Sequence, residues 1–207
     1  MIKRAARALG SLLLIGGLFW LGALLHEAGH IVSAWAFGAR LTHLNVLGFD
    51  LLPRPAWHFQ PGYYGFMRYE GDLTPTQGAV VRLWGSLATL SAALAAQALL
   101  WLARPRRGVA RLSVLTLCFF WLDILTHTLP TMGVPSYLFF GQHTVTSAAE
   151  AYLAAVELGM PGPLFQALMV GLALALLAAT VVRWVLLRWM DARDPNEVHF
   201  NQRMAGG

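Results

Sequence analysis

The chain has 207 residues, of which 57% are apolar and only 12% are charged, and its formal net charge is +5. This composition is too apolar for a soluble domain, and the length allows no more than one compact membrane unit. The pI near 10.0 does not indicate nucleic-acid binding, because the basic residues flank hydrophobic segments and form no stripe with an RNA-binding signature. We therefore predict an integral membrane protein without a nucleic-acid partner.

Four apolar segments are long enough to cross a bilayer, at residues 8–38, 79–103, 112–130 and 163–190. Lipid offers the backbone no hydrogen-bond partners, so each segment is expected to be helical. The predicted fold class is an all-α membrane protein of about four transmembrane helices, with a small membrane-associated β element after the first. Residues 1–190 form one polytopic domain in this interpretation, and residues 191–207 form a polar cytoplasmic tail.

The orientation follows from the basic residues, eleven of which lie in three places along the chain. If four helices alternate in direction, these places share one side, and the positive-inside rule assigns both termini and the middle loop to the cytoplasm. A bacterial plasma membrane is the expected location, since no eukaryotic targeting signal is visible. The three groups are Lys3, Arg4 and Arg7; Arg104, Arg106, Arg107 and Arg111; and Arg183, Arg188, Arg193 and Arg203.

The first span contains the sequence HEAGH, an HExxH pattern at residues 26–30. Positions i and i+4 share one face of a helix, so His26 and His30 can bind one zinc ion while Glu27 reaches a water at the metal. Ionisable groups in lipid are costly without a compensating partner, and a zinc ion would supply one. The alternative is a polar contact between helices, in which the histidines bond to the backbone or to each other.

The loop at 39–78 has two stretches rich in aromatic and branched residues, at 41–50 and 57–70, separated by prolines. This pattern predicts short strands and turns that form a small β element at the membrane face. Its aromatic side chains suit the membrane interface. The element either anchors the chain to headgroups or presents a substrate.

Small residues recur every four positions in the second and fourth spans, which predicts close helix packing there. The second span has Ala88, Ala92 and Ala96 in this spacing, and the fourth has Gly171, Ala175 and Ala179.

A catalytic zinc site normally takes three protein ligands, so a third ligand is expected outside HEAGH. Asp123 is the strongest candidate, because it is the only carboxylate in the third span and would be costly if buried unpaired. The alternative roles are a protonated Asp123 or one bonded to His127. His127 lies one turn further on, where it can orient Asp123 or replace it as ligand. His143 and Glu150, in the outer stretch, are weaker candidates.

HEAGH, the aromatic loop, the sequence Gly85-Ser86-Leu87-Ala88 and the pair Leu122-Asp123 occur in an order that resembles the site-2 protease family of intramembrane zinc metalloproteases. The resemblance covers residues 10–130. It implies a zinc endopeptidase of membrane-protein or peptide substrates, with His26, His30 and Asp123 as ligands and Glu27 as the catalytic residue. The chain departs from the family pattern at Ile124, where the family has glycine, and lacks the Asn-Pro-x-Pro residues before Asp123.

Three other functions are compatible with parts of the pattern. A noncatalytic membrane adaptor would keep the HEAGH helix without the third ligand. A di-iron oxygenase needs several histidine boxes, but only one pair among seven histidines has i, i+4 spacing. A metal transporter needs a polar path through the bundle, and the second and fourth spans have few polar groups. In the favoured topology, HEAGH lies about 7 Å past the middle of its span, toward the side opposite the cytoplasm.

Overall fold

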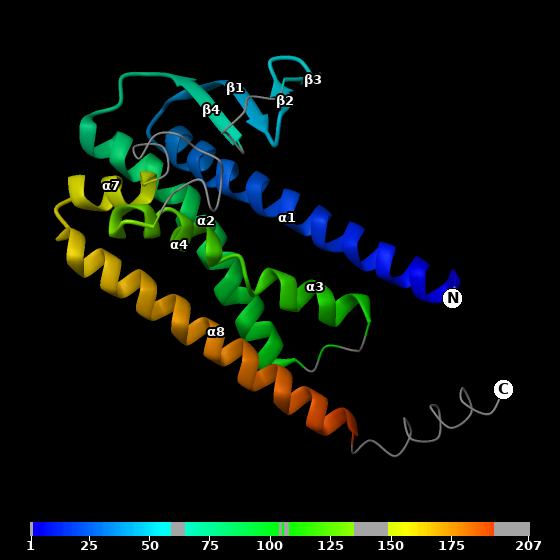
Figure 1. Ribbon diagram of the computed structural model, residues 1–207. Coiled ribbons are helices and arrows are strands. Elements are labelled where there is room, and N and C mark those ends of the chain that lie inside the picture. The colour runs from blue at the N-terminus through cyan, green and yellow to red at the C-terminus, as the bar shows by residue number, and fades with distance from the viewer. Residues whose placement is uncertain (1, 59–64, 104, 106–107, 135–148, 193–207) are drawn as a thin grey trace.

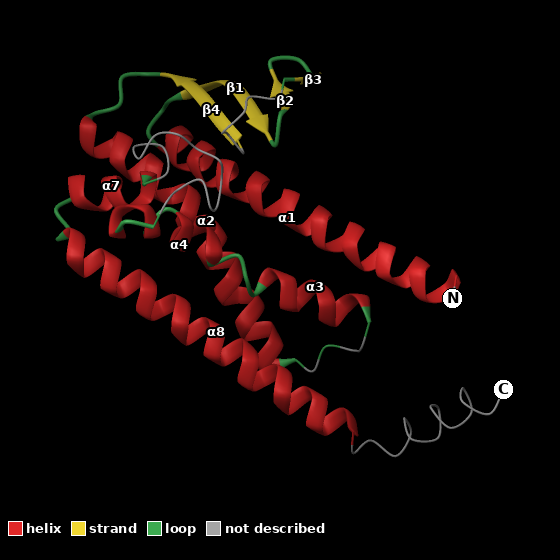
Figure 2. Cartoon of the chain, viewed as in Figure 1, coloured by secondary structure: helices red, strands yellow, loops and turns green. Residues whose placement is uncertain are grey.

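The computed structural model describes residues 2–58, 65–103, 105, 108–134 and 149–192. Within these ranges the chain is mostly helical, with a small antiparallel sheet after the first helix (Figures 1 and 2). The predicted fold class is confirmed. The elements are α1 Ile2–Ala36, β1 Arg40–Val46, β2 Phe49–Leu52, β3 Ala56–Trp57, β4 Gly65–Glu70, α2 Pro75–Leu102, α3 Val109–Leu117, α4 Leu122–Thr126, η1 Leu129–Met132, α7 Glu150–Glu157 and α8 Gly162–Ala192.

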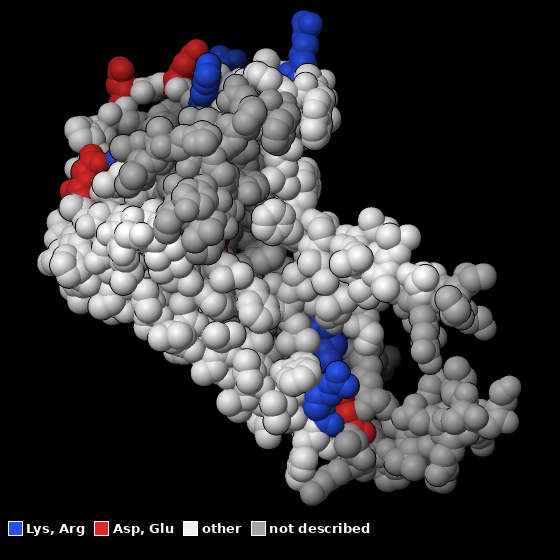
Figure 3. Space-filling model, in the orientation of Figure 1, with Lys and Arg blue, Asp and Glu red and all other residues white. Residues whose placement is uncertain are grey.

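Among the described residues, four helical segments are long and apolar enough to cross a membrane: Ala8–Ala36, Pro75–Leu102, Val109–Thr126 and Gly162–Asp191. They match the four spans expected from the sequence and indicate an integral membrane protein. Figure 3 shows charged side chains at two ends of the molecule, with a broad uncharged surface between them. This distribution fits a bilayer around the middle of the helices.

The third span is not the single regular helix expected from the sequence. Between α3 and α4, backbone N–H groups bond to carbonyls three residues back, from Phe119 to Thr116 at 3.0 Å and from Phe120 to Leu117 at 3.1 Å. This 3₁₀-type tightening keeps the N–H groups satisfied without a proline or glycine. It places Asp123 in a separate short helix, α4, directly after the break.

Helices α1 and α2 approach closely at Gly29. A Cβ on Gly29 would lie 2.8 Å from the Ala88 Cβ and against the Trp84 carbonyl, so the absence of a side chain permits this contact. The small residues of α2 therefore pack as expected at Ala88.

The start of α2 is fixed by a capping box between Thr74 and Gln77.

The fourth span packs differently from the expectation. A Cβ on Gly171 would meet no neighbouring atom within 4 Å in the described part of the chain, and the stripe of small residues that includes Gly171 is not the buried face of α8. The buried face carries Ala173, Leu176 and Thr180 instead. Ala173 and Leu176 join a core cluster with Leu90 of α2 and Ile124 of α4, so within the described residues the predicted stripe is not the packing face of α8.

The sheet has the strand order β3-β2-β1-β4, with neighbouring strands antiparallel. A two-residue turn joins β1 to β2, and both turn residues have positive φ, 50° at Leu47 and 81° at Gly48. These angles are typical of a type I′ hairpin. The sheet lies beside the C-terminal part of α1 (Figure 1), so β4 passes close to HEAGH.

Helix α7 lies against α2 through a face of small residues. Ala151, Ala154 and Ala155 are buried, and two of them join a core cluster with Leu90 of α2 and Phe165 of α8. Small side chains let the α7 backbone come close to its neighbours. The first residue of this helix, Glu150, is thereby held near α1.

Candidate metal centre

The two histidines of HEAGH direct one ring nitrogen each toward the other. His26 Nε2 and His30 Nε2 are 3.0 Å apart. His30 Nδ1 lies 2.7 Å from the Val81 carbonyl oxygen in α2. Since a carbonyl only accepts hydrogen bonds, His30 Nδ1 must carry the proton, and Nε2 of a neutral His30 holds a lone pair.

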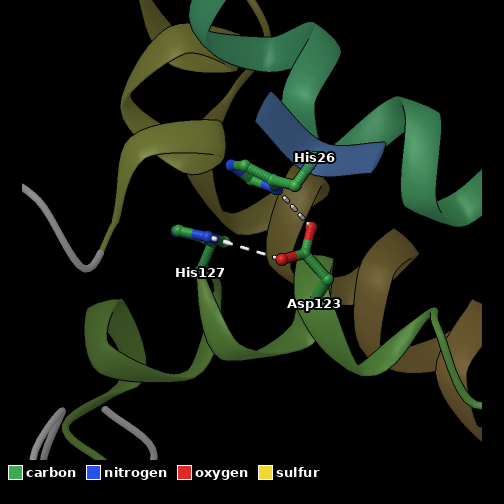
Figure 4. Close-up of side chains that lie close together, drawn as sticks. All are labelled: His26, Asp123 and His127. Carbon is green, nitrogen blue, oxygen red and sulfur yellow. Dashed lines mark hydrogen bonds and ion pairs between the residues drawn. The ribbon is translucent and has the colours of Figure 1, made fainter. Parts of the chain in front are cut away.

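Asp123 occupies the other side of the His26 ring (Figure 4). Its Oδ2 lies 2.9 Å from His26 Nδ1 and 2.8 Å from the Thr89 hydroxyl. An ionised carboxylate only accepts, so His26 Nδ1 donates to it and Nε2 of a neutral His26 also holds a lone pair. A carboxylate behind the imidazole is a common partner of metal-binding histidines.

These bonds leave the two Nε2 lone pairs facing each other. Two acceptors cannot form a hydrogen bond, so the 3.0 Å separation requires either a shared extra proton or a cation between the rings. Three carboxylates lie near the pair: Asp123 contacts His26, Glu150 lies near His30, and Glu27 interacts electrostatically with His26. A divalent cation would offset this negative charge in a low-dielectric environment.

A third ligand atom reaches the same point from α7. Glu150 Oε2 lies 3.9 Å from His30 Nε2, and one ligand atom each of His26, His30 and Glu150 falls within 4.8 Å of the others. Ligand atoms about 3.4 Å apart would be expected around a tetrahedral zinc ion with bonds of about 2.1 Å. The donor set therefore fits a metal ion.

Gly85 of α2 leaves the space beside this pair of imidazoles open. A Cβ there would lie 2.7 Å from His26 Nε2 and against the His30 ring. A side chain at position 85 would therefore displace the two imidazoles.

A second group of possible ligands shares His26 and consists of His26, Asp123 and His127. His127 Nε2 lies 3.8 Å from Asp123 Oδ1, and its ring stacks on that of His26 with centroids 5.4 Å apart. Figure 4 shows both histidines directed toward the Asp123 carboxylate. A metal ion here would use His26 Nδ1, on the opposite edge of the ring from His30.

Glu27 is buried, with 6% of its surface exposed. A Cβ on Gly65, the first residue of β4, would lie 3.0 Å from its Cδ and even closer to Oε1. Glu27 Oε2 has no hydrogen-bond partner in the part of the chain that the structure describes. A buried, unsatisfied carboxylate oxygen is costly unless a ligand or a water completes it.

The structure brings together six of the candidates named from the sequence: His26, Glu27, His30, Asp123, His127 and Glu150. His143 lies outside the described residues. Sequence reasoning missed the Val81 carbonyl and the Thr89 hydroxyl, both on α2. Thr89 is a polar residue in an apolar helix, but only the packing of α2 on α1 and α4 assigns it a partner.

Comparison of the chain with protein-family models, curated proteins and solved structures found no match.

Proposed function

We propose that this protein is an intramembrane zinc endopeptidase that cleaves membrane-protein or peptide substrates. The observation that carries the proposal is the pair of Nε2 lone pairs at 3.0 Å, with the buried Glu27 beside them on the same helix. Both histidines and the glutamate belong to one HExxH sequence, the arrangement of zinc hydrolases. The resemblance to site-2 proteases supports the same function.

His26 and His30 would hold the metal, and a nearby carboxylate would complete the site. Asp123 is the third ligand expected from the sequence, and Glu150 is its structural competitor. Zinc, when bound, supplies Lewis-acid activation of water and of the scissile carbonyl. Glu27 accepts the proton of the attacking water and passes it to the leaving amine.

The small sheet supports a role in substrate binding. A helical peptide bond is shielded, so a substrate has to be unwound before it is cleaved. Strand β4 ends the strand order and begins at Gly65, against Glu27. An extended segment could pair with such a strand through backbone hydrogen bonds, close to the catalytic base.

We propose a bacterial plasma membrane as the location, with both ends of the chain in the cytoplasm. The start of α1 and the end of α8 lie at one end of the molecule, and the sheet and α7 lie at the other (Figure 1). Arg111 pairs with Asp191 near the end of α8, and Arg183 and Arg188 lie in the same part of that helix, which supports the cytoplasmic assignment. The metal centre then faces the opposite side.

The test is cleavage by purified protein in liposomes that contain single-span membrane proteins. Wild-type protein with zinc should cleave at least one of them, the Glu27→Gln variant should keep zinc without cleavage, and His26→Ala should lose both. If wild-type protein binds zinc but cleaves none of a broad set of substrates, the proposed peptidase activity is contradicted. A wild type that binds no zinc would favour the membrane adaptor.

A further inference from the structure

We infer that Glu150 of α7 is the third metal ligand, and that Asp123 is a positioning residue that holds the His26 ring from behind. This assignment rests on the proposed metal site at His26 and His30. It differs from the ligand set that the sequence resemblance implies. It also gives α7, which has no counterpart in the sequence-based expectation, a function.

The orientation of the His26 ring separates Asp123 from His30. Its two nitrogens lie on different edges, and Asp123 Oδ2 bonds to Nδ1 while His30 Nε2 faces Nε2. A metal ion bound by both histidines contacts their Nε2 atoms. Asp123 is then on the far side of the ring, where it fixes the tautomer and raises the basicity of Nε2.

The Asp123 carboxylate already has hydrogen-bond partners. Its Oδ2 is already engaged by His26 Nδ1 at 2.9 Å and by the Thr89 hydroxyl at 2.8 Å. Its Oδ1 is directed toward His127 (Figure 4). Using Asp123 as a ligand of the His26–His30 ion would require breaking these contacts and rotating the side chain.

Glu150, in contrast, lies on the ligand side of His30 and within 4.8 Å of a ligand atom of His26. Its Oε2 is 3.9 Å from His30 Nε2, and its position is set by the buried alanine face of α7. An ion pair between Arg82 and Glu157 joins the other end of α7 to α2. Glu150 also lines a cavity of about 470 Å³ together with Arg82 and Glu157.

The experiment uses full-length protein in detergent, loaded with Co²⁺ in place of Zn²⁺. The visible absorption of Co²⁺ responds to the atoms bound to the metal, and competition with a chelator gives the zinc affinity. The variants are Glu150→Gln, Asp123→Asn and His127→Ala, with Glu70→Gln as the control. Glu70 carries the same charge and is exposed at the end of β4.

We expect Glu150→Gln to change the Co²⁺ spectrum and to weaken zinc binding by more than about 100-fold. Asp123→Asn should keep the spectral shape and weaken binding by about 10- to 100-fold, the usual effect of losing a partner of a ligating histidine. His127→Ala and Glu70→Gln should leave the spectrum unchanged. The inference would be overturned if the Asp123→Asn or His127→Ala variant changed the spectrum while Glu150→Gln did not. It would also be overturned if Glu150→Gln and Asp123→Asn both changed the spectrum, or if neither did.

These outcomes separate the inference from the proposed function. Failure of wild-type protein to bind Co²⁺ or Zn²⁺, or full binding by His26→Ala, would overturn both. If the protein binds metal with the expected spectra but shows no proteolysis, Glu150 remains the ligand and only the proposed peptidase activity is contradicted. Normal proteolysis with the carboxylate roles reversed would contradict only the assignment of Glu150.

Discussion

Two of the buried polar contacts made by helix α2 differ in what they leave unsatisfied. Toward α8, Gln97 donates to the Leu176 carbonyl and to the Thr180 hydroxyl. Toward α1, the Val81 carbonyl orients His30 so that a lone pair faces that of His26. The first contact joins neutral donors to acceptors and holds two helices together. In the second, two Nε2 acceptors face each other near several carboxylates, an arrangement that requires a cation or a proton between the two nitrogens.

The comparison shows that polarity within an apolar bundle does not by itself indicate function. Gln97 has one unpartnered oxygen among the described residues, yet the two possible metal-binding groups found there lie around His26. The direction of the donors and acceptors distinguishes the two contacts. The following changes test whether this distinction holds.

The largest expected effect is that of Glu27→Gln on catalysis. Loss of a general base typically lowers the rate by about 10²- to 10⁴-fold, and the amide keeps the shape of the side chain. Zinc content should stay at the wild-type level, since Glu27 is not a proposed ligand. Initial cleavage rates in liposomes measure the effect, with Gln97→Leu as the control from the other contact. Equal losses in the two variants would show that burial, not chemistry, matters at Glu27.

Gly85→Ala should weaken zinc binding by at least about tenfold, because the added Cβ meets the His26 and His30 rings. Gly78→Ala is the matched control in the same helix. It has open space at the Cβ position, and alanine is favoured over glycine in a helix by about 0.5–1 kcal/mol. Titration with a zinc indicator measures both affinities. If Gly85→Ala binds zinc as tightly as wild type, the ion does not lie between these imidazoles.

Gln97→Leu should affect stability and leave metal binding unchanged. Hydrogen bonds between membrane helices contribute about 0.6 kcal/mol on average and up to about 1.7 kcal/mol. A loss in this range is expected in the free energy of unfolding in mixed micelles. A large loss of zinc affinity in this variant would mean that the two contacts are coupled through α2.

The smallest expected effect concerns a histidine–carboxylate cluster in the sheet, away from the proposed metal centre. Asp50 accepts from Asn45 Nδ2 at 2.6 Å and lies 3.0 Å from His43 Nε2. The hydrogen bond from Asn45, with a further contribution from His43, holds the pKa of Asp50 below its usual range. Ionised Asp50 therefore stabilises the sheet above the ordinary carboxyl pKa, and this contribution is lost as the pH falls below about 4.

Asp50→Asn should accordingly make thermal stability less dependent on pH in this acidic range and leave zinc content unchanged. Circular dichroism melting curves at several pH values measure the first quantity, and the exposed Asp72→Asn variant is the control. An identical acid dependence in wild type and Asp50→Asn would contradict the role of this carboxylate. Loss of zinc would place a metal in the sheet instead of the bundle.

The parts of this molecule that depend on local spacing are predictable from the sequence. His26 and His30 share a face because they are one helical turn apart, and the four spans follow from length and hydropathy. Asp123 stands out because a lone carboxylate in lipid needs a partner, and the structure gives it one in His26.

The remaining features depend on contacts between distant segments. The break before α4 has no proline or glycine to indicate it, and α7 is too short to give a clear pattern. Glu150 reaches His30 only because an alanine face brings α7 onto α2. The direction of the His26 ring, which separates a ligand from a positioning carboxylate, is likewise set by packing.

The most direct test of the metal centre is the zinc content of purified wild-type and His30→Ala protein, measured by elemental analysis after removal of loosely bound metal. We predict one zinc ion per wild-type chain and loss of that ion in His30→Ala. Zinc-free wild-type protein after loading with the metal, or equal zinc in the two proteins, would contradict it.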